Sequence, residues 1–141
     1  MKRILFLCVA NSARSQMAEG MARSLLGESV HVESAGSSPT QLSPVAIQVM
    51  RELDIDISNQ FSKSVESIKN PETIGFIITL CGEEVCPTFF GRAKRLHWPL
   101  EDPVSDAVNP TEAFRKVRDQ IRQKITLLGE ELMAAAGDEY Q

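Results

Sequence analysis

Blocks of apolar residues alternate with polar loops along the chain, and their spacing predicts strands and helices in turn. Residues 2–9 contain the run Ile4-Leu5-Phe6-Leu7, which is typical of a buried strand. Apolar residues then recur at helical spacing over residues 14–26, and Gly27 provides a natural end to that helix. A shorter apolar stretch at residues 31–36 predicts a second strand, which leads into a loop rich in glycine, serine and proline.

The second half of the chain continues this alternation. Ser43-Pro44 combines a helix N-cap with a proline for the first helical turn, and apolar spacing carries that helix to Leu53. Residues 72–80 predict a buried third strand, and residues 94–98 predict a fourth. A cap and a first-turn proline at Asn109-Pro110 begin a long final helix, whose apolar stripe comprises Phe114, Val117, Ile121, Ile125, Leu128 and Leu132.

Strands separated by helices predict an α/β fold of three layers, in which a central four-stranded parallel sheet is flanked by helices. One domain of this kind fits the whole chain, residues 1–141. Active sites in parallel sheets gather beyond the carboxyl ends of the strands. That rule places Cys8, Cys81 and Asp102 at the same edge of the sheet.

Composition excludes several classes of function. The chain is 43% apolar and 24% charged, as in globular proteins, and its net charge of −4 with scattered basic residues argues against a nucleic-acid partner. No apolar stretch approaches the ~18 residues that span a membrane. The run at residues 4–10 is short and is followed at once by Asn11 and Arg14, which argues against a secretory signal. We therefore expect a cytoplasmic protein whose three cysteines are thiols unless catalysis oxidises them.

The segment between the first strand and the first helix carries the strongest chemical signal. A tight polar loop at a helix N-terminus gathers backbone N–H groups and positive dipole into an anion cradle. Arg14 can close the cradle with a planar fork, and the same field lowers the pKa of the Cys8 thiol, which favours the nucleophilic thiolate. Cys8 is therefore the candidate nucleophile, and the candidate oxyanion-binding residues are Val9, Ala10, Asn11, Ser12, Ala13 and Arg14. The alternative is a buried structural cysteine at the end of a core strand.

The spacing Cys8, five residues, Arg14 and Ser15 resembles the active-site loop of the low-molecular-weight tyrosine phosphatase superfamily. Within that superfamily, residues 11–19 look more like the thioredoxin-coupled arsenate reductases, because phosphatases usually carry proline where this chain has Gln16. The resemblance covers nearly the whole chain. It implies a low-molecular-weight phosphatase-like fold and reduction of arsenate to arsenite.

The segment from Cys81 to Pro87 holds the other two cysteines. In a helix, five residues rise ~7.5 Å, whereas a disulfide needs Cα atoms closer than ~7 Å, so Cys81 and Cys86 can pair only if the segment is not helical. The resemblance implies that Cys81 attacks the arsenic adduct on Cys8, and that Cys86 then takes over the disulfide and presents it to thioredoxin. Zinc binding is disfavoured because neither histidine has ligand spacing, and Cys86 as an incidental core residue stays open.

Asp102-Pro103 resembles the Asp-Pro of the superfamily, whose aspartate protonates the departing oxygen. The alternative is that Asp102 only opens a turn, as Asp-Pro pairs commonly do. Ser15 can donate its hydroxyl to the Cys8 thiolate, and it can equally be an ordinary first-turn residue. Asn11 is expected to hold the loop in a left-handed conformation.

Some reductases of this kind bind potassium through residues matching Asn11, Glu19 and Ser34 together with an acidic residue. Here Lys63 falls at the position of that acidic residue. Its ammonium would repel potassium and could replace it by pairing with Glu19, so we predict no potassium requirement. We also expect no metal and no cofactor. The alternative is that Lys63 is a solvated loop charge.

The leading hypothesis is thus a monomeric arsenate reductase that binds arsenate or a phosphate-like oxyanion and is regenerated by thioredoxin. One alternative is a tyrosine phosphatase on the same fold, which needs Cys8, Arg14 and Asp102 but neither other cysteine. A reductase coupled to glutaredoxin or a small thiol is a closer variant. A thiol sensor without catalysis would need the three sulfurs but not Asp102.

Overall fold

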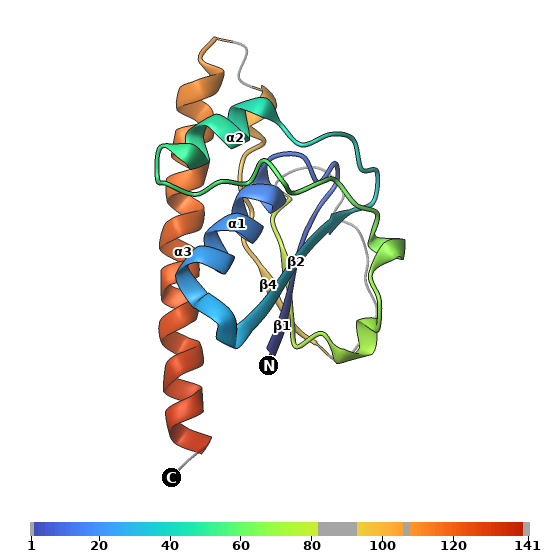
Figure 1. Ribbon diagram of the computed structural model, residues 1–141, viewed down its shortest axis with the longest axis vertical. Coiled ribbons are helices and arrows are strands. Elements are labelled where there is room, and N and C mark those ends of the chain that lie inside the picture. The colour runs from blue at the N-terminus through green and yellow to red at the C-terminus, as the bar shows by residue number, and fades with distance from the viewer. Residues whose placement is uncertain (1, 82–92, 106–107, 140–141) are drawn as a thin grey trace.

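The computed structural model of the chain describes residues 2–81, 93–105 and 108–139 (Figure 1). Its helices and strands are β1 (Lys2–Cys8), α1 (Arg14–Leu26), β2 (Val30–Gly36), α2 (Pro44–Arg51), β3 (Phe76–Thr79), β4 (Lys94–His97) and α3 (Pro110–Glu139). Short 3-10 turns lie between them at Gly27–Ser29, Val65–Ser67, Pro71–Thr73 and Pro103–Ser105. Among the described residues, no helix has both the length and the apolar character that a bilayer crossing requires.

Within the described residues, four strands form one parallel sheet in the order β2-β1-β3-β4, which confirms the predicted sheet. Strand β1 lies inside the sheet, and its apolar run is fully buried on both faces, as parallel strands require. Cys8 pairs with Gly36 at the end of β2, and Leu7 pairs with Thr79 at the end of β3. The carboxyl ends of these strands therefore meet at one edge, as the sequence predicts.

The two faces of the sheet are covered differently. Ile4 and Phe6 of β1 belong to the larger core, which they form with apolar residues of α1, α2 and α3. Leu5 and Leu7 point to the opposite face, where the described cover is a smaller cluster that includes Val65. The three helices lie together beside the sheet, and the long α3 runs the length of the molecule (Figure 1). The result is the expected three-layer α/β arrangement.

Two predicted boundaries are wrong by two residues or more, and each lies near a residue with a positive φ. The third strand begins at Phe76 rather than at residue 72, because Asn70 has φ 51° and starts the 3-10 turn that Pro71 continues. Helix α2 ends at Arg51 rather than Leu53, and Asp54, with φ 61°, turns the chain away.

Candidate oxyanion site

The loop between β1 and α1 faces its carbonyl groups toward the surrounding protein. Each of the five carbonyl oxygens of residues 9–13 accepts a hydrogen bond, and the donors include the backbone N–H groups of Ser38, Thr40 and Ser43 at 2.9–3.1 Å. In a planar trans peptide, the N–H of the following residue points the opposite way from the carbonyl. The amides of residues 10–14 are therefore turned to the other side of the loop, where they can converge on an anion.

Gly36 supports this loop from the end of β2. A Cβ atom added at Gly36 would lie 2.3 Å from the carbonyl oxygen of Val9, 2.9 Å from that of Cys8 and 3.0 Å from the amide nitrogen of Asn11. All three are backbone atoms, so none can rotate away. Only glycine allows the strand to approach the loop this closely.

Asn11 is the centre of the loop. It has φ 50°, which confirms the predicted left-handed conformation, and it is fully buried. Its Oδ1 accepts from the backbone N–H of Lys63 at 2.8 Å and from Gln16 Nε2 at 3.0 Å, while its Nδ2 donates to the Oγ atoms of Ser15 at 2.7 Å and Ser34 at 3.0 Å. Both hydrogens and both acceptor sites of the amide are used, which fixes the loop conformation.

Arg14 is buried at the edge where the strands end. Its Nη1 donates to the carbonyl oxygen of Leu100 at 3.0 Å and lies 3.5 Å from that of Leu80, and its Nη2 is 3.9 Å from Asp102 Oδ2. The structure therefore brings the predicted guanidinium and the predicted acid together beside the loop. Asp102 is also half-exposed and accepts from the backbone N–H of Val104 at 3.0 Å, so its turn-forming role is present as well.

Cys8 and Cys81 lie at the ends of neighbouring strands. The backbone N–H of Leu80 donates to the carbonyl oxygen of Leu7 at 3.0 Å. Cys81 follows Leu80 and Cys8 follows Leu7, so this bond brings the two cysteines near each other. Both cysteines are buried; Cys81 is disulfide-bonded, whereas Cys8 is not. The third predicted cysteine, Cys86, lies outside the described residues.

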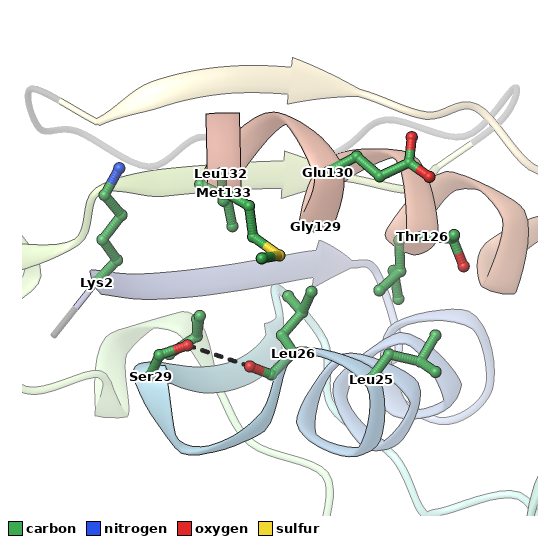
Figure 2. Close-up of a pocket in the computed structure, with 11 residues that line it drawn as sticks. Lys2, Leu25, Leu26, Ser29, Thr126, Gly129, Glu130, Leu132 and Met133 are labelled. Atoms are coloured by element: carbon green, nitrogen blue, oxygen red, sulfur yellow. Dashed lines mark hydrogen bonds between the residues drawn. The ribbon is translucent and has the colours of Figure 1, made fainter. Parts of the chain in front are cut away.

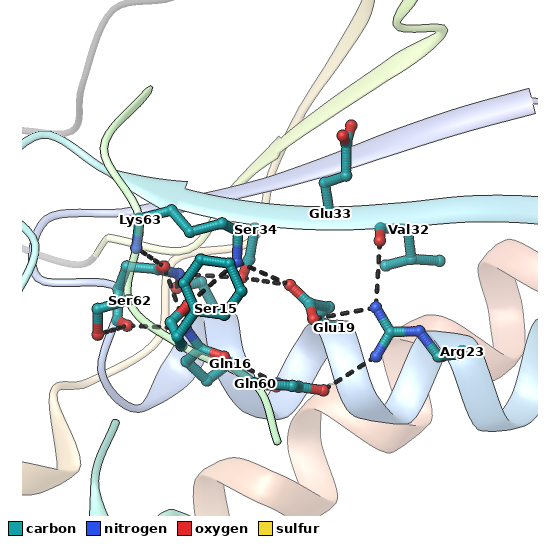
Figure 3. Close-up of polar contacts among 12 residues, drawn as sticks. Ser15, Gln16, Glu19, Arg23, Val32, Glu33, Ser34, Gln60, Ser62 and Lys63 are labelled. Atoms are coloured by element: carbon teal, nitrogen blue, oxygen red, sulfur yellow. Dashed lines mark hydrogen bonds and ion pairs between the residues drawn. The ribbon is translucent and has the colours of Figure 1, made fainter. Parts of the chain in front are cut away.

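Lys63 forms the ion pair that the sequence suggested. Its Nζ is 3.4 Å from Glu19 Oε1 and 3.1 Å from the carbonyl oxygen of Phe61, and the Oγ of Ser34 donates to the same Glu19 oxygen at 2.7 Å (Figure 3). The Lys63 side chain is only 18% exposed, so the alternative of a solvated loop charge is wrong. Glu19 is buried, and this pairing offsets the cost of desolvating its carboxylate.

Sequence reasoning missed three polar residues around the loop. Gln16 is fully buried, and its Nε2 donates to both the Oδ1 and the carbonyl oxygen of Asn11. Gln60 donates to Gln16, and the Oγ of Ser62 donates to the Asn11 carbonyl oxygen at 2.7 Å. Only Gln16 had a local signal, its place in the first turn of the helix. Gln60 and Ser62 reach the loop from more than forty residues away.

A cavity of about 760 Å³ lies away from these residues. It opens between the end of α1 and the second half of α3, and Leu25, Leu26 and Met133 line it near Lys2 (Figure 2). Lys2 begins β1, whereas Cys8 ends it. The cavity is therefore at the opposite edge of the sheet from the oxyanion loop and is no part of the site.

Comparison with known proteins gives a consistent picture. The sequence profile of the family described as low molecular weight phosphotyrosine protein phosphatase matches residues 3–136. A protein of Oceanobacillus iheyensis named arsenate reductase is 45% identical over 130 residues, which cover 88% of this chain and 92% of that protein. Arsenate reductase 2 of Staphylococcus saprophyticus is 42% identical over 126 residues, with 88% and 93% covered.

Solved structures resemble the fold closely. One described as an arsenate reductase in the phosphate binding state superposes with a TM-score of 0.80 at 35% identity and covers 93% of this chain and 98% of its own. A thioredoxin-dependent arsenate reductase from Corynebacterium glutamicum gives a TM-score of 0.67 at 30% identity, with 90% and 63% covered. With the loop, its arginine and the matched length together, the chain belongs to the low molecular weight phosphotyrosine protein phosphatase family.

Proposed function

We propose that this protein reduces arsenate to arsenite, with Cys8 as the nucleophile. The observation that carries the proposal is the loop of residues 9–13, whose outward carbonyls leave inward amides beside the buried Arg14. Relatives at 42–45% identity are named arsenate reductase, and a structural neighbour is described in a phosphate binding state. Arsenate and phosphate are both tetrahedral oxyanions, so one cradle of amides and one guanidinium suit either.

The first step joins sulfur to arsenic. The Cys8 thiolate attacks the arsenic atom of bound hydrogen arsenate, and the arsenate hydroxyl leaves as water after accepting a proton from Asp102. The amides of the loop and the Arg14 guanidinium stabilise the negative charge that remains on the other oxygens. The oxidation state of arsenic does not change in this step.

The second step carries the redox change. The Cys81 thiolate attacks the sulfur of Cys8, a disulfide forms, and the arsenic–sulfur bond breaks with both electrons going to arsenic. Arsenic(V) becomes arsenic(III) and leaves as arsenite, while two cysteine sulfurs are oxidised. Cys86 then attacks Cys81 and frees the Cys8 thiolate, and a thioredoxin dithiol reduces the disulfide between Cys81 and Cys86.

Two observations support this relay. Cys81 lies two residues beyond the end of β3, the strand that pairs with β1, and Cys8 ends β1, so the two cysteines lie at the same edge of the sheet. A relative at 30% identity is described as thioredoxin-dependent. Because Lys63 already pairs with Glu19, we further propose that the enzyme needs no potassium.

The test is arsenite formation measured with two electron donors, thioredoxin with its reductase and glutaredoxin with glutathione. We expect multiple turnovers with thioredoxin, and loss of those turnovers in Cys81→Ser and Cys86→Ser. Hydrolysis of an aryl phosphate by the same variants separates the alternative, since a phosphatase needs neither cysteine. Unchanged phosphate hydrolysis in both variants, with no arsenite formed by the wild type, would favour a phosphatase.

A further inference from the structure

Four hydrogen bonds connect Arg23, on the exposed side of α1, with Ser15 in the first turn of the same helix, and all four have the same donor-to-acceptor direction. In each bond the donor is on the Arg23 side and the acceptor is on the Ser15 side, so the side-chain amides of Gln60, Gln16 and Asn11 follow one another head to tail. Figure 3 shows Arg23, Gln60 and Gln16. The bonds run from Arg23 Nη1 to Gln60 Oε1 (3.1 Å), from Gln60 Nε2 to Gln16 Oε1 (2.8 Å), from Gln16 Nε2 to Asn11 Oδ1 (3.0 Å) and from Asn11 Nδ2 to Ser15 Oγ (2.7 Å). We call these five residues the amide chain.

Groups of fixed polarity hold each amide in this orientation. Gln60 Nε2 also donates to the backbone carbonyl of Gln16 at 3.0 Å, and Gln16 Nε2 also donates to that of Phe61 at 2.9 Å. Asn11 Oδ1 accepts from the backbone N–H of Lys63, which can only donate. Turning any of the three amides over would set oxygen against oxygen or N–H against N–H. The donor-to-acceptor direction of the amide chain is therefore fixed from Arg23 to Ser15.

A second arm leaves Arg23 and returns to the same asparagine. Arg23 Nη2 donates to Glu19 Oε2 at 3.0 Å, and Glu19 Oε1 accepts from the Oγ of Ser34 at 2.7 Å. Because Ser34 gives its only proton to this carboxylate, its oxygen must accept from Asn11 Nδ2, which lies 3.0 Å away. The two arms close a ring and aim the amide of Asn11 from both sides.

The last hydrogen bond of the amide chain, from Asn11 to Ser15, determines which hydrogen bond the Ser15 hydroxyl can donate. A serine hydroxyl has one proton, and the Asn11 amide already donates to its oxygen. That proton is therefore available to a further acceptor. Ser15 lies in the first turn of α1, which follows the loop of residues 9–13, and its side chain is fully buried. Cys8 lies at the other end of the same loop. A thiolate at Cys8 is a charged acceptor, so a hydrogen bond from Ser15 to it is stronger than one to a neutral group.

We propose that Arg23 and Gln60 are positioning residues for the nucleophile: acting through Gln16 and Asn11, they make Ser15 a hydrogen-bond donor to the Cys8 thiolate. This inference rests on the proposed role of Cys8. Aligned dipoles headed by a guanidinium strengthen one another, so the effect reaches the sulfur although neither residue contacts it. Arg23 is 54% exposed and water can replace part of its contribution, so Gln60 should matter more.

The test measures the nucleophile without the redox cycle. In full-length protein carrying Cys81→Ser and Cys86→Ser, Cys8 is the only thiol, and its rate of alkylation by iodoacetamide is followed against pH. We expect Gln60→Met to raise the midpoint of this profile by about half a pH unit to one unit, and Arg23→Met to raise it less. The matched control is Gln120→Met on the exposed side of α3, which should leave the midpoint unchanged.

A double-mutant cycle separates positioning from general loosening of the fold. If the amide chain acts through Ser15, then Gln60→Met adds nothing to the midpoint shift caused by Ser15→Ala. Gln60→Glu, which keeps an acceptor for Arg23 but loses the donor to Gln16, should raise the midpoint as well, and it serves if the methionine variant does not fold. Additive shifts, or a Gln60 variant with a wild-type midpoint and a lowered melting temperature, would overturn the proposal. Failure of arsenite formation alone would instead count against the proposed function, because alkylation requires no arsenate.

Discussion

Replacing Gly36 with alanine should disable the oxyanion loop while leaving the sheet folded. The added Cβ would lie 2.3 Å from the carbonyl oxygen of Val9, a distance that real Cβ atoms essentially never show. Ordinary contact begins near 3.4 Å, so this carbonyl must retreat by about 1 Å. The Val9 carbonyl shares a peptide plane with the amide of Ala10, so the inward N–H of Ala10 moves with it.

The size of the effect follows from this displacement. A shift of about 1 Å in groups that position a reacting centre costs on the order of 100-fold in rate, or about 2.7 kcal/mol of transition-state stabilisation. The same movement lengthens the 2.9 Å hydrogen bond from Ser38 to the Val9 carbonyl, which adds a smaller loss of stability. We therefore expect kcat/KM for arsenate reduction to fall by about 100-fold in Gly36→Ala.

The matched control is Gly75→Ala, just before β3 in the same sheet. Its Cβ would meet only the carbonyl oxygen of Arg3 at 3.6 Å, which is ordinary contact. Thioredoxin-coupled arsenate reduction and thermal unfolding are measured on both variants. Near wild-type activity in Gly36→Ala, or equal loss in both variants, would refute the idea that the end of β2 sets the shape of the loop.

Four further outcomes follow from the structure. Arsenate reduction by the wild type should change by less than about twofold on potassium titration, and strong potassium activation would contradict this. Lys63→Met, which removes one of the two cations paired with Glu19 and leaves Arg23, should lose about 1–3 kcal/mol of stability in a denaturant titration. Hydrogen bonds from Arg115, then from Arg118, lower the pKa of Glu52 from 4.5 to about 2, so the stability it contributes is complete above pH 4.5 and is lost as the pH falls toward 2. The difference in melting temperature between wild type and Glu52→Gln should shrink across that window, and a constant difference would be the contrary result. Asp102→Asn keeps an oxygen for the Val104 turn, but its amide is not an acid and cannot protonate the leaving oxygen. Single-turnover loss of arsenate should therefore slow by about 100-fold or more, and an unchanged rate would leave Asp102 as a turn residue only.

Where the sequence predicted the local structure of the candidate site correctly, the prediction depends on local signals. Residues 8–15 form one continuous strand, loop and helix start, and each step has its own mark in the chain: an apolar run, an asparagine that tolerates a positive φ, and helical spacing that begins at Arg14. The pairing of Lys63 with Glu19 was also predicted. Lys63 stands where the potassium-binding reductases have an acidic residue, and its charge is opposite to that of Glu19.

The parts that sequence reasoning missed depend on contacts between distant segments. Gly36 was placed in a strand, but nothing in its neighbourhood indicates that the backbone of Val9 packs against its Cα. Gln60 looks like any polar loop residue, and its role is visible only when residue 16 is found beside it. The start of β3 was misplaced for a local reason. Asparagine can adopt a positive φ but does not have to, so its presence at residue 70 did not indicate the turn that delays the strand.

Whether Cys8 is the nucleophile is decided by measuring arsenite formation by wild type and by Cys8→Ser, with thioredoxin, its reductase and NADPH in excess. We expect repeated turnover by the wild type and none by the variant, because we assign the bond to arsenic to the sulfur of Cys8. Continued arsenite formation by the serine variant would show that the arsenic is reduced at another sulfur.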